Sequence, residues 1–345
     1  MNDATQRPLK IAVLGAGSWG MTLADYCAEL GHSVVLWEYD AAAAERLQKT
    51  RKREELLPGF RLADKVAVTN NLQEALHQAQ IILLVVPTHV MRAVLQQVKK
   101  HLHYTDREAL IVNCAKGIET DTLCRISEVV QQELSEAFAE RYVVLSGPSH
   151  AEEVFRRIPT AIVAASRKEE PALFIQKQLS STCLRIYRST DVVGVELGGA
   201  LKNVIAIAAG VCDGAGFGDN TKAALQPRGL AEIARLGRKM GAEPLTFAGL
   251  SGMGDLIVTC MSRHSRNRYV GEQIGRGRKT AEILAEMTMV AEGVKTAKAA
   301  VQLSKKYQVE MPICSQVYAL LYEDKDPRQA LLDLMTREVK PEIWS

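Results

Sequence analysis

The sequence lacks the cysteine patterns that mark disulfide-rich or metal-binding proteins. Its seven cysteines are scattered, with no Cys-x-x-Cys pair and no cysteine–histidine spacing of a metal site. An odd, irregular set of cysteines is typical of a reducing compartment rather than of a disulfide framework. We therefore expect a cytoplasmic protein that holds no metal ion.

The chain also lacks a long apolar run and a basic block. No segment reaches the roughly 18 uninterrupted apolar residues of a membrane span, and the first residues, MNDATQRPLK, hold no apolar signal region. The net charge is only +3, and the densest basic run, KTRKR at 49–53, continues directly into Glu54 and Glu55. We expect neither a membrane span nor a nucleic acid partner.

What the sequence does have is an ordinary globular composition and a change of pattern along the chain. Of its 345 residues, 47% are hydrophobic and 24% are charged, which is sufficient for two domains with large cores. Up to about residue 190, short runs rich in Val, Ile and Leu alternate with amphipathic segments, and the rest is helical in pattern. Such runs are typical of a parallel sheet that helices cover on both faces. The expected strands are 9–15, 33–38, 65–69, 81–87, 109–114, 142–147, 160–166 and 183–189.

The segment GAGSWG at 15–20 fits G-x-G-x-x-G between an expected strand and an expected helix, which predicts a dinucleotide site. Gly15 permits the tight turn, Gly17 lets the backbone approach a pyrophosphate, and Gly20 lets the helix pack on the strand. Free N–H groups at the helix start then face the phosphates. The alternative is a glycine turn without a ligand. The predicted domains are a Rossmann-type doubly wound α/β domain over 1–189 and a helical substrate-binding, catalytic domain over 190–345.

Glu38 stands at the end of the second expected strand, where a carboxylate can accept hydrogen bonds from the adenosine ribose. This position favours NAD, because Glu38 would repel the 2′-phosphate of NADP. Two alternatives stay open: Glu38 is a solvated carboxylate, or basic residues downstream approach a 2′-phosphate. Those residues are Arg46, Lys49 and Arg51. The expected cofactor is NAD or NADP, with NAD favoured.

Other expected strands also end in polar residues, and ligands of open parallel sheets bind outside those ends. VVPTH at 85–89, NCAKGIE at 113–119 and LSGPSHAEEV at 145–154 are three such ends. Lys116, which precedes Gly117, could reach both a nicotinamide ring and a substrate. The alternative is an exposed loop lysine.

One lysine of the helical half lies in an apolar helix. In LGGALKNVIAIAAGV, 197–211, only Asn203 beside Lys202 is polar, and no carboxylate stands three or four residues away. Burial lowers the pKa of a lysine, which makes Lys202 a candidate general base for an alcohol proton. The alternative is a structural lysine paired with a distant acid, for which Asp255 in LSGMGDLIVT is the best partner.

Two further helix starts carry charged side chains. In RHSRNRY, 263–269, Ser265 and Asn267 suit a helix start, and Arg266 is one of three arginines on the same turn. Such a turn suits a phosphate, although a basic solvated surface is the alternative. In AEGVKTAK, Glu292 either favours the helix dipole or holds a cofactor amide or ribose.

Taken together, these motifs resemble those of the bacterial NAD(P)-dependent glycerol-3-phosphate dehydrogenases. The matching stretches run from about residue 10 to residue 320 in family order. They include GAGSWG, VVPTH, AKGIE, SGPSHAEEV, GVELGGALKNVIAIAAGVCDGAGFGDNTKAAL, LSGMGDLIVTC, SRNR and AEGVKTAK. The resemblance implies reversible reduction of dihydroxyacetone phosphate by NAD(P)H to sn-glycerol 3-phosphate, a phospholipid precursor.

The resemblance also implies roles for individual residues. Lys202 matches the proton donor and acceptor at the C2 oxygen. The implied substrate contacts are Lys116, Gly147, Ser149, Lys202, Asp255, Ser265, Arg266 and Asn267. The glycine motif and the resemblance together give the cofactor contacts as Gly15, Gly17, Ser18, Trp19, Gly20, Glu38, Lys116, Ala151, Arg266, Val290 and Glu292.

Two further points concern the cofactor and the space around Lys202. Glu38 and Tyr39 stand where the family often has a small residue and then a basic one, which again favours NAD. Gly198, Gly199 and Ala200 are expected to leave room beside Lys202 for the nicotinamide and the substrate. Two other functions are weighed: a related 3-hydroxyacid-type dehydrogenase and a non-catalytic NAD(H)-sensing protein. A homodimer is the default expectation for such an enzyme.

Overall fold

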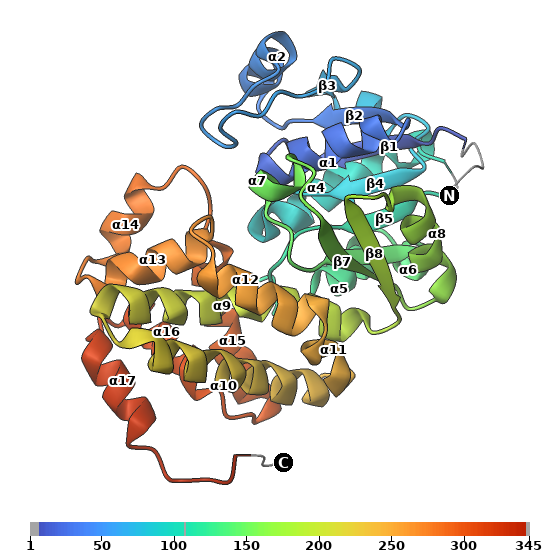
Figure 1. The fold of residues 1–345 in the computed structure, drawn as a ribbon. Helices are drawn as coiled ribbons and strands as arrows, with labels where there is room; N and C mark the ends of the chain where they lie inside the picture. Colours follow the sequence, from blue (N-terminus) through green and yellow to red (C-terminus); the bar gives the residue numbers. More distant parts are fainter. Residues whose placement is uncertain (1–6, 107, 343–345) are drawn as a thin grey trace.

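The computed structural model describes residues 7–106 and 108–342, so the outer ends of both predicted domains lie outside it. Its first half contains one eight-stranded sheet with the order β3-β2-β1-β4-β5-β6-β7-β8 (Figure 1). Every expected strand is present. The strands are β1 (Lys10–Leu14), β2 (Ser33–Trp37), β3 (Ala67–Thr69), β4 (Ile81–Leu84), β5 (Leu110–Asn113), β6 (Tyr142–Ser146), β7 (Thr160–Ala165) and β8 (Leu184–Ser189).

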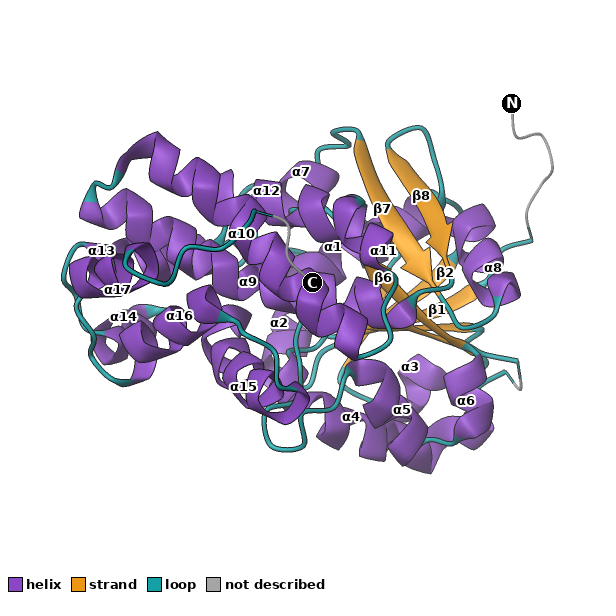
Figure 2. Ribbon diagram, turned by 90° about the horizontal axis from the view of Figure 1, so that it is seen from below, coloured by secondary structure: helices purple, strands orange, loops and turns teal. Residues whose placement is uncertain are grey.

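Helices connect these strands and cover both faces of the sheet. They are α1 (Ser18–Glu29), α2 (Ala41–Thr50), α3 (Leu72–Leu76), α4 (Thr88–His101), α5 (Ile126–Glu133), α6 (Glu136–Glu140), α7 (Ala151–Val154) and α8 (Glu169–Leu179). Alternate residues of β1 face opposite sides, because successive strand side chains point in opposite directions. Ile11 and Val13 share a core with α1 and α8, and Ala12 and Leu14 share another with α3, α4 and α5. Figure 2 shows α3, α4, α5 and α6 together on one side of the strands.

Neighbouring strands run parallel except for β6 and β7, which pair antiparallel. The connection between these two contains only the four-residue helix α7. It therefore contains no full-length crossover helix of the kind that usually joins parallel neighbours. The sheet is parallel over its remaining pairs, and the predicted doubly wound α/β fold is confirmed.

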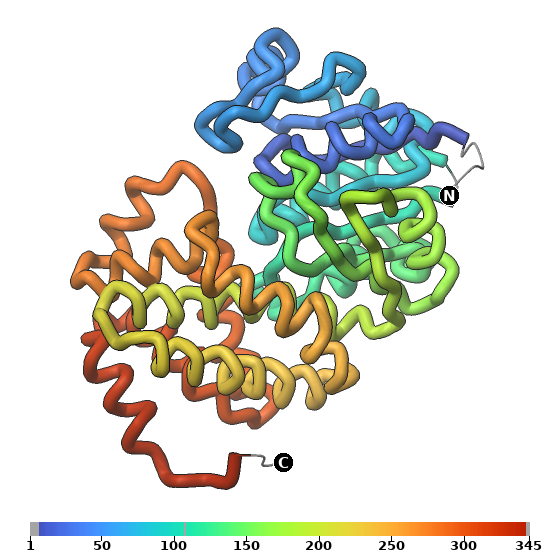
Figure 3. The backbone as a smooth tube through the Cα atoms, in the orientation of Figure 1, coloured from blue at the N-terminus to red at the C-terminus, as the bar shows by residue number. Residues whose placement is uncertain are grey.

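The second half is helical, as predicted. Its helices are α9 (Val192–Ala215), α10 (Gly218–Lys239), α11 (Pro244–Ala248), α12 (Asp255–Met261), α13 (Arg266–Gly275), α14 (Thr280–Glu286), α15 (Glu292–Tyr307), α16 (Pro312–Tyr322) and α17 (Pro327–Met335). Helix α9 forms the centre and packs against α10, α12, α13, α15 and α16. It also touches β6 and β7, so the two halves lie side by side (Figure 3).

The sequence of α9 explains its length and central place. The side chain of Asp191 caps its start by accepting a hydrogen bond from the Gly194 N–H at 2.8 Å. Gly216, at φ 72°, ends it in the left-handed conformation that favours glycine. Among the described residues, α9 alone is long and apolar enough to cross a membrane, and 89% of its apolar window is buried inside the protein. It has the burial of a core helix. All seven cysteines of the chain are free thiols.

Candidate active site

Lys202, Asp255 and Lys116 meet where the helical half faces the sheet half. Lys202 lies on α9, Asp255 is the first residue of α12, and Lys116 lies in the loop after β5. The ammonium of Lys202 donates a hydrogen bond to Asp255 Oδ1, and that of Lys116 donates to Asp255 Oδ2 at 2.7 Å. Two cations therefore share one carboxylate, which is only 1% exposed.

The glycine-rich segment before Asp255 fixes the position of this carboxylate. It forms a π-helical turn, Leu250–Gly254, and α12 begins directly after it. A Cβ on Gly252 would lie 2.1 Å from the carbonyl oxygen of Phe247, so this turn requires glycine. At the first position of α12, the helix dipole stabilises the negative charge of Asp255.

Thr259 completes the surroundings of Lys202 and was not predicted from the sequence. Its hydroxyl donates to the backbone oxygen of Asp255 at 2.6 Å and accepts from Lys202 Nζ at 2.6 Å. The spacing of four residues from Asp255 places both side chains on one face of α12. That spacing, on a helix opened by a candidate acid, is the signal that could have identified Thr259.

Burial and charge shift the pKa values of this cluster in opposite ways. Burial lowers the pKa of Lys202 to about 8, although Asp255 acts against this shift. For Asp255, burial acts in the raising direction, but the charges and hydrogen bonds of Lys116 and Lys202 outweigh it and hold the pKa of the carboxyl below its ordinary value. At neutral pH the cluster thus contains an ionised acid and a lysine that is close to releasing its proton.

Lys116 also joins this cluster to the turn after β6. Its ammonium donates to the Gly147 carbonyl at 2.8 Å and reaches the Ser149 hydroxyl at 3.5 Å. Gly147 has φ 138°, and a Cβ there would lie 2.9 Å from the Cα of Ile162. Only glycine fits both constraints. The structure therefore brings together Lys116, Gly147, Ser149, Lys202 and Asp255.

A chain of amides links the starts of α13 and α15 to this centre. The amide of Asn267 donates to Asn203 Oδ1 at 2.9 Å, and its own oxygen accepts from the Gly293 N–H at 2.9 Å. Asn203 in turn donates to the Lys116 backbone oxygen at 3.3 Å. Beside it, Glu292 accepts from the N–H of Thr88, the first residue of α4, at 3.0 Å.

The arginines near the start of α13 differ in their contacts. Ser265 caps the helix by accepting from the Arg268 N–H at 3.2 Å, and the guanidinium of Arg268 pairs with Asp213 at 2.6 Å. Arg266 is exposed, and within the described residues its guanidinium has no hydrogen bond or ion pair. Arg263 is exposed as well and likewise has no ion pair within the described residues, so it is the position of Arg266 on α13 itself that makes it the candidate for an anion.

The glycine loop has the shape that a pyrophosphate requires. Gly15 has φ 115°, and a Cβ there would lie 2.9 Å from the Val85 carbonyl oxygen. A Cβ on Gly20 would lie 1.8 Å from the Gly15 oxygen, whereas the space around Gly17 is open. These residues fit a dinucleotide, and Ser18 and Trp19 start the helix that follows.

The other predicted cofactor residues lie on three separate segments. Ser18 donates to the Leu56 carbonyl at 2.8 Å and contacts the sulfur of Met289 at 3.6 Å, which brings the loop containing Val290 to the glycine loop. Val290 itself is half-buried, and Ala151 is buried at the start of α7. For these two residues the structure gives a place near the start of a helix rather than a specific contact.

Glu38 pairs with an arginine that the sequence did not single out. The Arg53 guanidinium donates to Glu38 Oε2 at 2.9 Å and to the Ala16 carbonyl of the glycine loop at 3.1 Å. Of the basic residues considered beforehand, Arg46 is exposed on α2, whereas Lys49 and Arg51 have other contacts. Lys49 pairs with Glu45 at 2.5 Å, and Arg51 donates to the Val66 carbonyl at 2.6 Å.

His150 is a further residue of the site that was not predicted. Burial, followed by the charges of Lys202 and Lys116, lowers the pKa of His150 to about 4. Its Nε2 is buried and has no hydrogen-bond partner in the described part of the chain. The ring lies 6.1 Å from that of His264, which approaches from the helical half.

Two family models together cover most of the chain. The model described as NAD-dependent glycerol-3-phosphate dehydrogenase N-terminus matches residues 10–172, and that of the C-terminus matches residues 191–332. A curated glycerol-3-phosphate dehydrogenase of the NAD(P)+ type from Citrifermentans bemidjiense is 52% identical over 333 residues, 96% of this chain and 98% of the relative. A second relative with the same description, from Syntrophotalea carbinolica, is 50% identical over 335 residues, which are 97% of this chain and 100% of the relative.

The chain belongs to the NAD-dependent glycerol-3-phosphate dehydrogenase family. The resemblance inferred from the motifs is thus confirmed. Family membership favours an NAD(P)-dependent oxidoreductase over the 3-hydroxyacid-type and NAD(H)-sensing alternatives.

Solved structures agree with this assignment. The crystal structure of glycerol-3-phosphate dehydrogenase from Coxiella burnetii is 34% identical with a TM-score of 0.90, and the match covers 96% of this chain and 99% of that one. A ketopantoate reductase from Ralstonia eutropha has a TM-score of 0.59 at 15% identity, covering 95% of this chain and 100% of that one. The second likeness concerns the fold alone.

One expectation about the glycerol-3-phosphate dehydrogenase motif GVELGGALKN is wrong. Gly198 and Gly199 leave no free space beside Lys202. A Cβ on Gly198 would lie 2.7 Å from the Ser251 oxygen, and one on Gly199 would lie 2.7 Å from the Ser146 hydroxyl. These glycines let α9 pack closely against the π-helical turn and β6.

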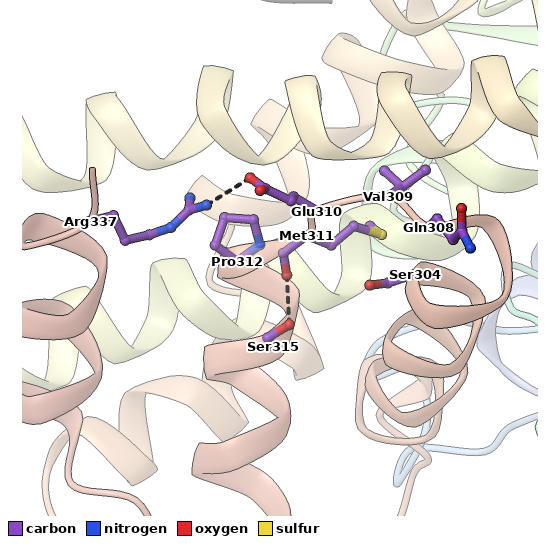
Figure 4. Close-up of a pocket in the computed structure, with 8 residues that line it drawn as sticks. All are labelled: Ser304, Gln308, Val309, Glu310, Met311, Pro312, Ser315 and Arg337. Carbon is purple, nitrogen blue, oxygen red and sulfur yellow. Dashed lines mark hydrogen bonds and ion pairs between the residues drawn. The ribbon is translucent and has the colours of Figure 1, made fainter. Parts of the chain in front are cut away.

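Two surface depressions of this glycerol-3-phosphate dehydrogenase fold differ in how near they lie to the site. One of about 450 Å³ is formed between α15, α16 and the segment after α17, where Arg337 pairs with Glu310 (Figure 4). It contains none of the predicted site residues. Another, of about 580 Å³, extends from Glu153 on α7 to His264 and passes Gly254, next to Asp255.

Proposed function

We propose that the chain catalyses the reversible NAD(P)H-dependent reduction of dihydroxyacetone phosphate to sn-glycerol 3-phosphate, which supplies glycerophospholipid synthesis. The observation that carries this proposal is the buried Lys202, paired with Asp255 and with a pKa lowered to about 8. In the proposed division, residues 1–189 bind the cofactor, and residues 190–345 hold the substrate and the acid–base group.

Lys202 is the proposed general acid and base. In reduction, its ammonium gives a proton to the C2 oxygen as the carbonyl becomes an alcohol. In oxidation, its neutral amine takes the hydroxyl proton. When bound, the nicotinamide supplies or accepts the hydride at C2. Asp255 and Thr259 hold Lys202 Nζ in one orientation, since each makes a hydrogen bond to it.

The substrate is proposed to lie between the two halves. Lys116, Gly147 and Ser149 would contact it from the sheet side, with Lys202 and Asp255 from the helical side. Its phosphate would meet Arg266 at the start of α13, where free backbone N–H groups and a guanidinium without an ion pair favour an anion. Ser265 and Asn267 would complete that end.

The remaining predicted residues are proposed to hold the cofactor. The pyrophosphate would lie on the glycine loop, and Glu38 would face the adenosine ribose. The full proposed set is Gly15, Gly17, Ser18, Trp19, Gly20, Glu38, Lys116, Ala151, Arg266, Val290 and Glu292. A cytoplasmic homodimer is the proposed state, supported by the free thiols and by the prevalence of two-fold oligomers.

The test is oxidation of NADH or NADPH in the presence of dihydroxyacetone phosphate, followed by the absorbance of the reduced nicotinamide. Wild type should oxidise at least one cofactor rapidly, and Lys202→Ala should lose at least about a hundredfold in kcat. The control is Lys298→Ala, which removes an exposed lysine of α15. No oxidation by wild type with either cofactor would overturn the proposed function.

A further inference from the structure

We propose that Arg53 is a specificity residue that binds the 2′-phosphate of NADP, and that it forms with Glu38 a pair able to serve either cofactor. With NAD, Glu38 would accept hydrogen bonds from the ribose hydroxyls while Arg53 keeps its present contacts. With NADP, Arg53 would exchange Glu38 for the phosphate. This inference rests on the proposed function and adds the residue that decides between its two cofactors.

The position of Arg53 supports this role. Its guanidinium touches both the glycine loop, at the Ala16 oxygen, and Glu38 at the end of β2, while its Nε donates to the exposed Glu55 at 3.2 Å. These two points border the place where the adenosine ribose lies in a glycine-loop dinucleotide fold. The side chains of Arg53 and Glu38 are only 17% and 16% exposed. Solvent therefore screens their charges less than those of a surface pair.

The backbone around Arg53 is firmly anchored. Leu56 accepts a hydrogen bond from Ser18 at 2.8 Å, and Leu57 and Phe60 are buried in the core beneath α1. Since this segment is fixed to the cofactor loop itself, only the Arg53 side chain has to move for the exchange. Glu38 is also restrained, because its Oε1 accepts from the Asp40 N–H at 3.1 Å.

The charges around Glu38 make such a residue necessary. A 2′-phosphate carries up to two negative charges and would meet the carboxylates of Glu38 and Asp40. A guanidinium can bind a phosphate through two parallel N–H donors, which is stronger than a single lysine contact. Two other basic side chains nearby are directed elsewhere, because Lys49 binds Glu45 and Arg51 binds the Val66 carbonyl. Arg46 is exposed on α2, and its charge acts on Glu55.

The test measures dissociation constants of NADPH and NADH by nucleotide fluorescence for wild type, Arg53→Gln and Glu38→Gln. Arg53→Gln should raise the dissociation constant of NADPH at least about tenfold, which is the loss expected for a charge-assisted pair. It should raise the dissociation constant of NADH less than about threefold. Glu38→Gln should lower the dissociation constant of NADPH and raise that of NADH. The control is Lys52→Gln. This variant also removes one positive charge, at the neighbouring position, but the side chain of Lys52 pairs with Glu54.

The outcomes separate this inference from the proposed function. Equal weakening of both cofactors by Arg53→Gln, or no change in either, would overturn the role of Arg53 while leaving the dehydrogenase assignment intact. If Arg53→Gln does not fold, two measurements replace it: the dissociation constants for Arg53→Lys, and the salt dependence of NADPH and NADH binding by wild type. Added salt should weaken the binding of NADPH more than the binding of NADH. An identical salt dependence for the two nucleotides would overturn the inference. Wild type that binds neither cofactor would overturn the proposed function as well.

Discussion

Lys202 and Asp255 are 53 residues apart in the sequence and form a buried ion pair between α9 and α12. Each residue alone would be costly in its apolar surroundings, because an isolated buried charge loses its hydration. Lys116 adds a second cation to the same carboxylate. Asp255 therefore stays ionised while Lys202 titrates near neutral pH, the condition under which one lysine can act as acid in one direction and as base in the other.

The two directions of the reaction should depend on pH in opposite ways. The protonated fraction of Lys202 falls as pH rises through about 8. Since reduction needs the ammonium, its kcat/KM should be constant below that pH and fall by about tenfold per pH unit above it. Oxidation needs the neutral amine, so its kcat/KM should rise with pH and level off above that value.

Initial rates in both directions, from about pH 6 to about pH 10, would test this dependence. His150→Gln is the matched variant, because a histidine with a pKa of about 4 stays neutral over this range. The midpoint should be the same in that variant. A midpoint at the ordinary lysine value of 10.5 would contradict the role given to the burial of Lys202.

Thr259→Val should reduce kcat by about tenfold or more with little effect on KM, because Lys202 loses a hydrogen-bond acceptor. The same loss removes an interaction that favours the ammonium, so the midpoint of the pH profile should move to lower pH. Thr259→Ser, which keeps the hydroxyl, should retain most of the activity. A lower kcat with an unmoved midpoint would indicate that Thr259 acts through packing only.

Glu196 should make a large contribution to stability. Its carboxylate accepts from Arg125 at 2.8 Å, from the Ser127 N–H at 2.8 Å and from the Tyr142 hydroxyl at 2.6 Å. These contacts connect α9 to α5 and β6 across the two halves. Glu196→Gln removes the buried counter-charge of Arg125, which keeps its ion pair with the more exposed Glu128 at 3.0 Å, and we expect a loss of about 1–3 kcal/mol in the free energy of unfolding.

Urea unfolding followed by circular dichroism would measure this loss. The control is Glu169→Gln, because Glu169 forms an exposed ion pair with Arg188 at 2.8 Å. Exposed pairs contribute about 0–1 kcal/mol, so this variant should unfold close to wild type. Equal unfolding midpoints for the two variants would contradict the role assigned to Glu196.

Arg266→Ala should raise KM for dihydroxyacetone phosphate by at least about tenfold, since a charge-assisted contact to the phosphate is lost. The unphosphorylated analogue dihydroxyacetone should be affected much less. Steady-state kinetics on both compounds would measure the difference, with Arg263→Ala, an exposed arginine three positions earlier, as the control. An equal effect on both compounds would instead support a 3-hydroxyacid-type substrate.

The sequence predicts those parts of the site whose residues contrast with their own surroundings. Lys202 stands alone in an apolar helix, and the glycine loop has a spacing that few other structures need. The eight strands are likewise visible as runs of Val, Ile and Leu. Such features depend on local preference and on burial, both of which leave a periodic pattern.

The features that escaped prediction depend on how distant elements meet. Arg53 looks like one cation in a basic run, and only the fold brings it to Glu38. Thr259 and His150 lie in ordinary sequence contexts, and the space beside Gly198 is filled by a turn more than fifty residues away in the chain, at Ser251. The reversal between β6 and β7 is a matter of strand pairing, which composition alone does not reveal.

The sharing of Asp255 by two lysines links proton transfer to the contact between the halves. Lys116 belongs to the sheet half, whereas Lys202 and Asp255 belong to the helical half. In the proposed mechanism, Lys202 becomes neutral when it protonates the C2 oxygen, and Asp255 then has a single cation, Lys116, left to neutralise it. The Lys116–Asp255 pair is then the ion pair of this cluster that joins the two halves. Uptake of a proton by Lys202 restores the second cation at Asp255, so the charge balance at this link between the halves would alternate with each turnover.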